Sequence, residues 1–267
     1  MKNIAVIGGG AAGFFSAISV KTHYPNYDVF LFEKSSKILS KVKISGGGRC
    51  NVTNSTRDID VLTKAYPRGG KKLKNIFHQF GTLDTRNWFE TRGVPLKVEP
   101  DGRVFPISNN SQSIIDCLVN ECEKSNIKIE LLKSVKALSK VKSKWIINFN
   151  DTSSSISFDS VIIASGGSPK LKGFDWLKIL GHKIINPIPS LFTFNMPNEP
   201  IISLSGIALK NVRIKILDTK IEILGPLLIT HWGMSGPVIL KASSIGAREL
   251  FDKKYFFELQ INWLIES

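Results

Sequence analysis

The sequence predicts an α/β fold in which a Rossmann-like dinucleotide-binding domain over residues 1–187 is followed by an inserted, β-rich domain over residues 188–267. Three observations predict it. A strand, glycine-rich turn, helix, strand and acid follow one another at the N-terminus. A later apolar run ends in a second glycine pair, at residues 166–167. After residue 187 prolines accumulate and short strand-like runs dominate.

The N-terminal turn, Gly-Gly-Gly-Ala-Ala-Gly at residues 8–13, carries the most specific pattern. Gly8 allows a tight turn, Gly10 lets the backbone approach a pyrophosphate, and Gly13 lets the helix lie close to the strand. The helix N-terminus adds free N–H groups for the phosphates. Glu33 ends the next apolar run and is placed to accept hydrogen bonds from ribose hydroxyls. These residues predict a dinucleotide site.

The rest of the first domain is predicted from periodicity. Helices are expected over residues 71–92 and 111–124, and a β-meander over residues 135–158. The apolar run 159–164 predicts a fully buried parallel strand that brings the following glycine pair close to a ligand. Residues 34–56 are expected to form a long loop.

In the second domain, the apolar runs predict strands over residues 191–195, 212–217 and 221–224. A helix is expected over residues 237–250.

A second motif lies in the predicted loop, where Ser45 is followed by three glycines, Arg49, Cys50 and Asn51. Three consecutive glycines, Gly46, Gly47 and Gly48, predict exposed backbone N–H donors with a cation beside them. Such a loop suits a phosphate, or the edge of a flavin that gains negative charge on reduction.

Charge and composition restrict the partners. The formal net charge is +14, which indicates either a polyanionic partner such as RNA or a solvated basic surface. The densest basic segment is 64–74. Three scattered cysteines indicate neither a disulfide framework nor a metal site, and packing is the expected role of Cys117 and Cys122. No apolar run is long enough for a membrane span, and glycines interrupt any signal-like segment, so a cytoplasmic protein is expected.

Several further segments match one family in order and spacing. The chain resembles the flavoproteins known as BaiN-like or YhiN-like NAD(P)/FAD-dependent oxidoreductases. The matching stretches are residues 6–13 with Glu33 and Lys34, then 44–54, 102–108, 164–169, 180–182, 187–191 and 225–237. The Ser-Gly-Gly-Gly-Arg-Cys-Asn loop and the Thr-His-x-Gly-x-Ser-Gly-Pro stretch are the most specific of these.

The resemblance implies FAD on a Rossmann-like domain of the two-dinucleotide-binding type. The pyrophosphate would contact Gly8, Gly10, Ala12 and Gly13, and the adenosine ribose would contact Glu33, with Lys34 beside it. The adenine would meet the Val135 backbone, and the cofactor would pass beside Ala164, Gly166 and Gly167. The flavin would be approached by Gly46, Gly47, Gly48, Arg49, Cys50 and Asn51. Family members continue for roughly another third of their length, with a late glycine-rich segment that closes the flavin site. We therefore expect this chain to be truncated at its C-terminus, with that return segment absent.

The resemblance also implies hydride transfer from reduced flavin to an activated C=C bond, either of uridine in ribosomal RNA or of a small, steroid-like enone. The net charge favours RNA. The electron source is NAD(P)H or a separate reductase. A proton donor is needed, and His231 and Cys50 are the candidates by residue type, against structural roles as a loop residue and a packed thiol. A non-catalytic nucleotide-binding remnant, which the expected truncation supports, is the alternative of a different class.

Overall fold

The computed structural model describes residues 1–150 and 155–264. Two compact units divide the chain, Met1–Ile184 and Ile185–Ser267. The sequence places its domain boundary three residues later. Residues 151–154 of the predicted meander, and the last three residues of the predicted second domain, lie outside the described part of the chain.

The first unit is built on a parallel sheet with the strand order β10-β1-β2-β6. Its strands are β1 (Asn3–Ile7), β2 (Asp28–Phe32), β6 (Lys128–Glu130) and β10 (Ser160–Ile163). The central strand β1 pairs in parallel with β2 on one side and with β10 on the other. This arrangement confirms the predicted α/β fold and brings the carboxyl ends of the four strands to one edge.

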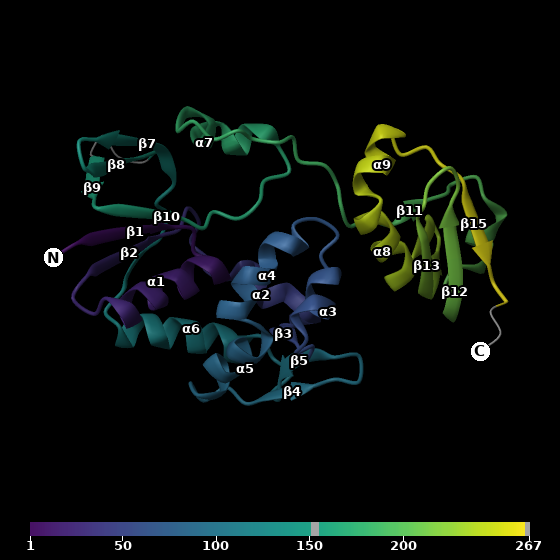
Figure 1. Ribbon diagram of the computed structural model, residues 1–267, viewed down its shortest axis with the longest axis horizontal. Coiled ribbons are helices and arrows are strands. Elements are labelled where there is room, and N and C mark those ends of the chain that lie inside the picture. The colour runs from purple at the N-terminus through teal and green to yellow at the C-terminus, as the bar shows by residue number, and fades with distance from the viewer. Residues whose placement is uncertain (151–154, 265–267) are drawn as a thin grey trace. The chain divides into compact units, whose positions relative to one another are not determined.

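The two faces of this sheet are covered differently, as Figure 1 shows. The covering elements are α1 (Ala11–His23) and α6 (Gln112–Lys124) on one face, and the antiparallel meander β7 (Val135–Val141), β8 (Lys144–Phe149) and β9 (Ser155–Phe158) on the other. Side chains alternate along β1, so Ile4 and Val6 pack in the core of the helical face. Ala5 and Ile7 pack in the core beneath the meander.

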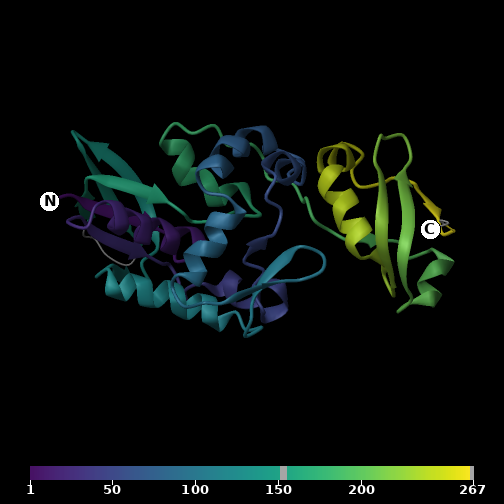
Figure 2. The ribbon, with the colours of Figure 1, turned by 60° about the horizontal axis from the view of Figure 1, so that its bottom comes forward.

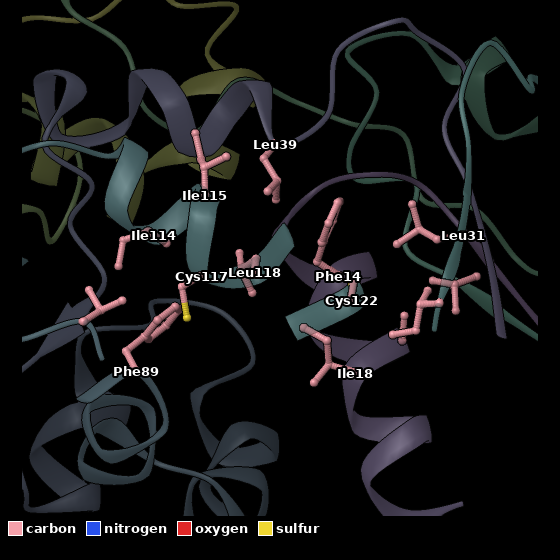
Figure 3. Packing of buried hydrophobic residues seen from close by; sticks show 14 of the residues in the cluster. Phe14, Ile18, Leu31, Leu39, Phe89, Ile114, Ile115, Cys117, Leu118 and Cys122 are labelled. Atoms are coloured by element: carbon pink, nitrogen blue, oxygen red, sulfur yellow. The ribbon is translucent and has the colours of Figure 1, made fainter. Parts of the chain in front are cut away.

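The helical face carries the larger core of the first unit (Figure 3). Phe14 and Ile18 of α1 point into it together with Leu118 and Cys122 of α6, and all four are nearly inaccessible to solvent. Burial of a Phe, Ile or Leu side chain stabilises the folded state by about 1.5–3 kcal/mol. This packing fixes the start of α1, and with it the glycine-rich turn, against the ends of the strands.

The strand β10 differs from its prediction. It runs parallel to β1, as expected, but it forms an edge of the sheet in the described structure and is not buried on both faces. Ile163 at its end is 39% exposed. An apolar run alone does not distinguish a central strand from an edge strand, because it carries no information about the neighbouring strand.

The segment 34–56, predicted as a loop, contains regular structure. It holds a short helix α2 (Ser40–Ile44), a 3-10 turn η1 (Ser45–Gly48) and the short strand β3 (Thr53–Asn54). Further elements follow along the chain: α3 (Ile59–Lys64), α4 (Gly70–Gln79), α5 (Thr82–Glu90), β4 (Leu96–Val98), β5 (Arg103–Pro106), η2 (Leu171–Phe174) and α7 (Asp175–Ile179). The strands β3, β5 and β4 form a small antiparallel sheet.

The second unit is an antiparallel sheet with the order β11-β14-β13-β12-β15, which confirms the β-rich character expected there. Its elements are β11 (Phe194–Asn195), η3 (Pro200–Leu204), β12 (Ala208–Ile216), β13 (Glu222–Thr230), β14 (Gly233–Ser235), α8 (Pro237–Ile245), α9 (Ala247–Asp252) and β15 (Leu259–Asn262). The yellow helices in Figure 2 lie along the green strands of this sheet. The single helix predicted over 237–250 is interrupted at Gly246, where a Cβ would meet the Ile221 side chain at 2.5 Å.

Candidate dinucleotide-binding site

The glycine-rich turn joins β1 to α1 in a shape that only glycine permits. Gly8 has φ +115°, and its N–H donates to the carbonyl of Phe32 at 2.8 Å. A Cβ on Gly8 would collide with the carbonyl of Ala164, at the end of β10. A Cβ on Gly13 would collide with the carbonyl oxygen of Gly8. The two glycines therefore let α1 and β10 approach the turn closely.

Gly10 differs from these two glycines. It precedes the first residue of α1, and a Cβ placed on it would have no protein atom within 4 Å. The protein itself therefore does not require glycine there. Gly10 is thus an open position at a helix N-terminus, between two glycines that are closely packed against the protein. Such a position fits a turn that accommodates the phosphates of a ligand.

Glu33 is held in place by the turn it faces. Its Oε2 accepts a hydrogen bond from the Gly9 N–H at 2.8 Å, and its Oε1 accepts from the N–H and the hydroxyl of Ser35, each at 2.9 Å. Partial burial acts to raise the pKa of this carboxyl, but the hydrogen bonds from Gly9 and Ser35 outweigh it, and the pKa lies below its ordinary value. The carboxylate is therefore ionised and oriented at neutral pH.

A cleft of about 390 Å³ opens at the carboxyl edge of the parallel sheet. The Lys133 N–H donates to the Glu33 carbonyl at 2.8 Å, which draws the start of β7 alongside the end of β2. Six residues expected to bind the cofactor line this one cleft: Gly8, Glu33, Lys34, Val135, Gly166 and Gly167. Lys133 and Lys172 also line it, so its charged lining is mainly positive.

The glycine loop before Asn51 has a defined conformation. Gly46, Gly47 and Gly48 all have positive φ, and Cys50 follows with φ +63°. Ser111, which is fully buried, closes both ends of the loop: its hydroxyl donates to the Lys43 carbonyl and its N–H donates to the Gly48 carbonyl, each at 2.8 Å. Cβ atoms on Gly47 and Gly48 would meet no protein atom within 4 Å. The loop is thus fixed by the protein on one side and open on the other.

Arg49 makes its contacts with other residues of the protein. Its Nη1 lies 2.5 Å from Oε1 of Glu99, and its guanidinium lies 4.0 Å from the ring centroid of Phe105. The Phe105 ring also lies under the loop, where a Cβ on Gly46 would meet it at 2.9 Å. Arg49 therefore anchors the loop, in a pairing with Glu99 that the sequence pattern did not indicate.

A second cavity, of about 510 Å³, lies between α1, the glycine loop and α5. Ala12, Cys50 and Asn51 line it, together with aromatic side chains that include Phe15 and Trp88. Burial raises the pKa of the Cys50 thiol, against a smaller opposing effect of its hydrogen bond with Ser45. Cys50 is thus a neutral thiol near pH 7, a form that can donate a proton but is a poor nucleophile.

His231 lies in the second unit, at the tip of the hairpin between β13 and β14. Thr230 pairs with Gly233, so His231 and Trp232 form a two-residue turn. The two rings meet edge to face with centroids 4.4 Å apart, and Trp232 is 41% exposed. Below the turn the hydroxyl of Thr230 is buried without a hydrogen-bond partner among the described residues. The imidazole of His231 is exposed to solvent.

Other features restrict the chemistry. Within residues 1–150 and 155–264, no group of three or more His, Cys, Asp or Glu residues could hold a metal ion. No helix in the same residues is long and apolar enough to cross a membrane. Cys50, Cys117 and Cys122 are free thiols, and burial raises the pKa of Cys117 to about 11 and that of Cys122 to about 12. The latter two pack in the core.

Three site residues escaped the sequence analysis, and two of them carried a usable signal. Ser35 follows Glu33 at the spacing of a local side-chain turn, and Ser111 stands at the cap position of the predicted helix 111–124. Lys41 carried no signal, because its position beside the second glycine turn depends on where the chain folds back. It lies in α2, beside Gly166.

Comparison with known proteins agrees with this geometry. A model described as "HI0933-like protein Rossmann domain" matches residues 2–224, and one described as "HI0933-like protein barrel and H2TH domain" matches residues 188–266. The chain belongs to the HI0933-like family. The family resemblance inferred from the motifs is thereby confirmed. HI0933-like proteins of the BaiN and YhiN type are flavin-dependent oxidoreductases, so a flavin cofactor is supported for the family.

Two curated relatives of this HI0933-like chain carry different activities in their names. It is 27% identical over 262 residues to the 3-dehydro-bile acid delta(4,6)-reductase of Clostridium scindens, covering 95% of this chain and 63% of that protein. It is 30% identical over 252 residues to the ribosomal RNA dihydrouridine synthase of Escherichia coli, covering 90% of this chain and 60% of that protein. The chain therefore spans somewhat under two thirds of the length of these relatives.

A solved structure supports the fold of the HI0933-like chain. The open conformation of a flavocytochrome c3 fumarate reductase superposes with a TM-score of 0.56 at 17% sequence identity. The match covers 78% of this chain and 47% of that one. At this identity the likeness concerns the fold, which agrees with the predicted dinucleotide-binding architecture.

Proposed function

We propose that this protein is an FAD-dependent oxidoreductase that passes hydride from reduced flavin to an activated C=C bond, with uridine in ribosomal RNA as the first candidate acceptor. One observation carries the cofactor assignment. Gly8, Glu33 and Val135, which are far apart in the sequence, line one cleft at the carboxyl edge of a parallel sheet. This is the place where open α/β folds bind nucleotides.

The residues of the chain have separate roles in this proposal. The start of α1 and the glycine loop hold the phosphates and the flavin edge, while the Glu33 carboxylate orients the ribose. When bound, FAD supplies the hydride. One carbon of the C=C bond receives the hydride, and the other carbon takes a proton. The candidate proton donors are the neutral thiol of Cys50 and the exposed imidazole of His231. NAD(P)H or a separate reductase supplies the electrons.

RNA is favoured by the helical hairpin of α3 and α4. Both of its acids are engaged: Asp58 accepts from the N–H groups of Asp60 and Val61, and Asp60 pairs with Lys74 at 2.5 Å. The remaining lysines of the hairpin are Lys64, Lys71 and Lys72. These three form no ion pair within the part of the chain that the structure describes, and they present positive charge to a polyanion. The nearby Tyr66 ring, 41% exposed, offers a surface on which a base can stack.

A small enone is the second candidate acceptor, and the 510 Å³ cavity favours it. Phe15, Phe80 and Trp88 line that cavity, and the Phe15 ring contacts both of the others, with ring centroids 5.1 Å from Phe80 and 5.3 Å from Trp88. Cys50 lies in the same wall. An apolar ring system bound there would lie close to a neutral proton donor.

The deciding experiment supplies both acceptors to the same protein. The chain is loaded with FAD, reduced without oxygen, and mixed with a ribosomal RNA fragment or with a steroid 4-en-3-one. Flavin reoxidation with formation of dihydrouridine supports the RNA acceptor, whereas reoxidation by the steroid alone supports the enone. Bound FAD without reoxidation by either would leave a non-catalytic nucleotide-binding protein, and failure to bind FAD would overturn the proposal.

The RNA surface has its own test. Replacing Lys64, Lys71 and Lys72 with glutamine should weaken RNA binding and flatten its dependence on salt, because fewer counterions are released. The matched control replaces Lys210, Lys220 and Lys241, three exposed lysines of the second unit. An equal loss of RNA affinity in both triple variants would indicate general charge attraction and would remove the hairpin from the proposal.

A further inference from the structure

Lys41 lies between the two glycine turns of the first unit. The helix α2 that carries it is tied to the first turn, because the Leu39 N–H donates to the Gly9 carbonyl at 2.8 Å. Its ammonium lies at the second turn, where a Cβ on Gly166 would be 3.9 Å from Nζ. Lys41 also lines the 510 Å³ cavity with Ala12, in the first turn of α1. The turn after β1, the turn after β10 and the start of α1 thus lie around this cation.

The charge of Lys41 has no protein counterpart. It forms no ion pair among residues 1–150 and 155–264, and the first turn of α1 contains no acidic residue. Lys43, two residues later, behaves differently, since its Nζ donates to Oε1 of Gln112 at 2.7 Å. The lysines of the adjacent cleft, together with the N-terminal end of α1, add further positive potential. An anion placed here would be stabilised by all of these groups.

We propose that Lys41 is a phosphate-binding residue, whose ammonium pairs with the pyrophosphate of the dinucleotide held at the glycine turns. The assignment rests on the FAD binding proposed above, and adds a charged side chain to a phosphate site otherwise built from backbone N–H groups. The first turn is tied to the helix that carries Lys41, and the ammonium lies at the second turn, so the residue also couples the end of β1 to the end of β10. Its loss should weaken every ligand that carries the pyrophosphate.

The test compares Lys41→Met, Lys41→Arg and the matched control Lys43→Met in the full chain. Dissociation constants for FAD are measured by quenching of flavin fluorescence, and those for ADP by calorimetry. Lys41→Met should weaken both ligands about tenfold to hundredfold, the range of a charge-assisted hydrogen bond. Lys41→Arg should restore most of the affinity, and Lys43→Met should bind as the unaltered chain does. Thermal melts without ligand show whether the variants fold equally.

The other outcomes separate the alternatives. Equal affinity in Lys41→Met and Lys43→Met would overturn the assignment while leaving FAD binding intact. Loss of FAD affinity without loss of ADP affinity would overturn it too, and would place the ammonium at the flavin. Failure of the unaltered chain to bind either ligand would overturn the proposed cofactor, and the role of Lys41 with it.

Discussion

The carboxylate of Glu33 accepts a hydrogen bond at 2.8 Å from the backbone N–H of Gly9, so the acid that follows β2 is attached to the turn that follows β1. A Cβ on Gly9 would lie 2.8 Å from the Glu33 Cβ, so the contact also requires glycine at that position. Ser35 occupies the other carboxylate oxygen. Glu33 therefore has a structural role before any ribose reaches it, and its remaining lone pairs are already oriented.

We predict that Glu33→Gln lowers the affinity for FAD about tenfold to hundredfold, because hydrogen bonds to a charged group are worth about 1.5–3 kcal/mol. Flavin fluorescence titration measures the change. The control is Glu123→Gln, at an exposed position of α6 away from the cleft. An unchanged FAD affinity in Glu33→Gln would mean that this carboxylate serves the turn alone.

The same carboxylate should make stability depend on pH. The pKa of Glu33 is lower in the folded protein than its ordinary value of 4.5. Its contribution to the free energy of unfolding is therefore present above about pH 4.5 and is lost as the pH falls through the folded pKa. The stability difference between the unaltered chain and Glu33→Gln should shrink between about pH 6 and pH 3. Urea titrations across this range would contradict the prediction if the difference stayed constant.

Gly10 and Gly13 should respond in opposite ways to alanine. Gly13→Ala forces a Cβ into the Gly8 carbonyl and should destabilise the fold by about 2–4 kcal/mol. Gly10→Ala has open space and should cost less than about 1 kcal/mol, an N-cap effect. If the phosphates lie against Gly10, the same variant loses at least tenfold in FAD affinity. Chemical unfolding and FAD titration of both variants check the pair, and normal FAD binding by Gly10→Ala would place the phosphates elsewhere.

These contrasts show which parts of the site a sequence can predict. The roles of Gly8 and Gly13 follow from local sterics, and the sequence predicted them. The pairing of Arg49 with Glu99 joins residues 50 positions apart through a β-hairpin, and no periodic pattern records such a contact.

The same distinction holds for the fold. The β-α-β unit and the meander were predicted because each buries its own apolar periodicity. The helix α2 was missed because its start depends on a contact with Gly9 and on Leu39 in a left-handed conformation, at φ 52°. The edge position of β10 depends on its neighbours in space, which a run of apolar residues does not identify.

The final prediction concerns the anchoring of the glycine loop. The contacts of Arg49 with Glu99 and with the Phe105 ring should be lost in Arg49→Lys, because an ammonium reproduces neither the fork nor the planar stacking of a guanidinium. Backbone amides of residues 46–50 should then exchange with solvent faster, and FAD affinity should fall. Hydrogen exchange measured by mass spectrometry resolves this segment.

The chain contains a matched control for this variant. Arg92, two residues after the end of α5, bonds Glu121 of α6 at 3.0 Å and lies 4.1 Å from the Trp88 ring centroid, so it repeats the same arrangement. Arg92→Lys should cost comparable stability without changing exchange at residues 46–50. Because Ser111 also holds both ends of the loop, unchanged exchange in Arg49→Lys would show that Ser111 suffices and that Arg49 does not anchor the loop.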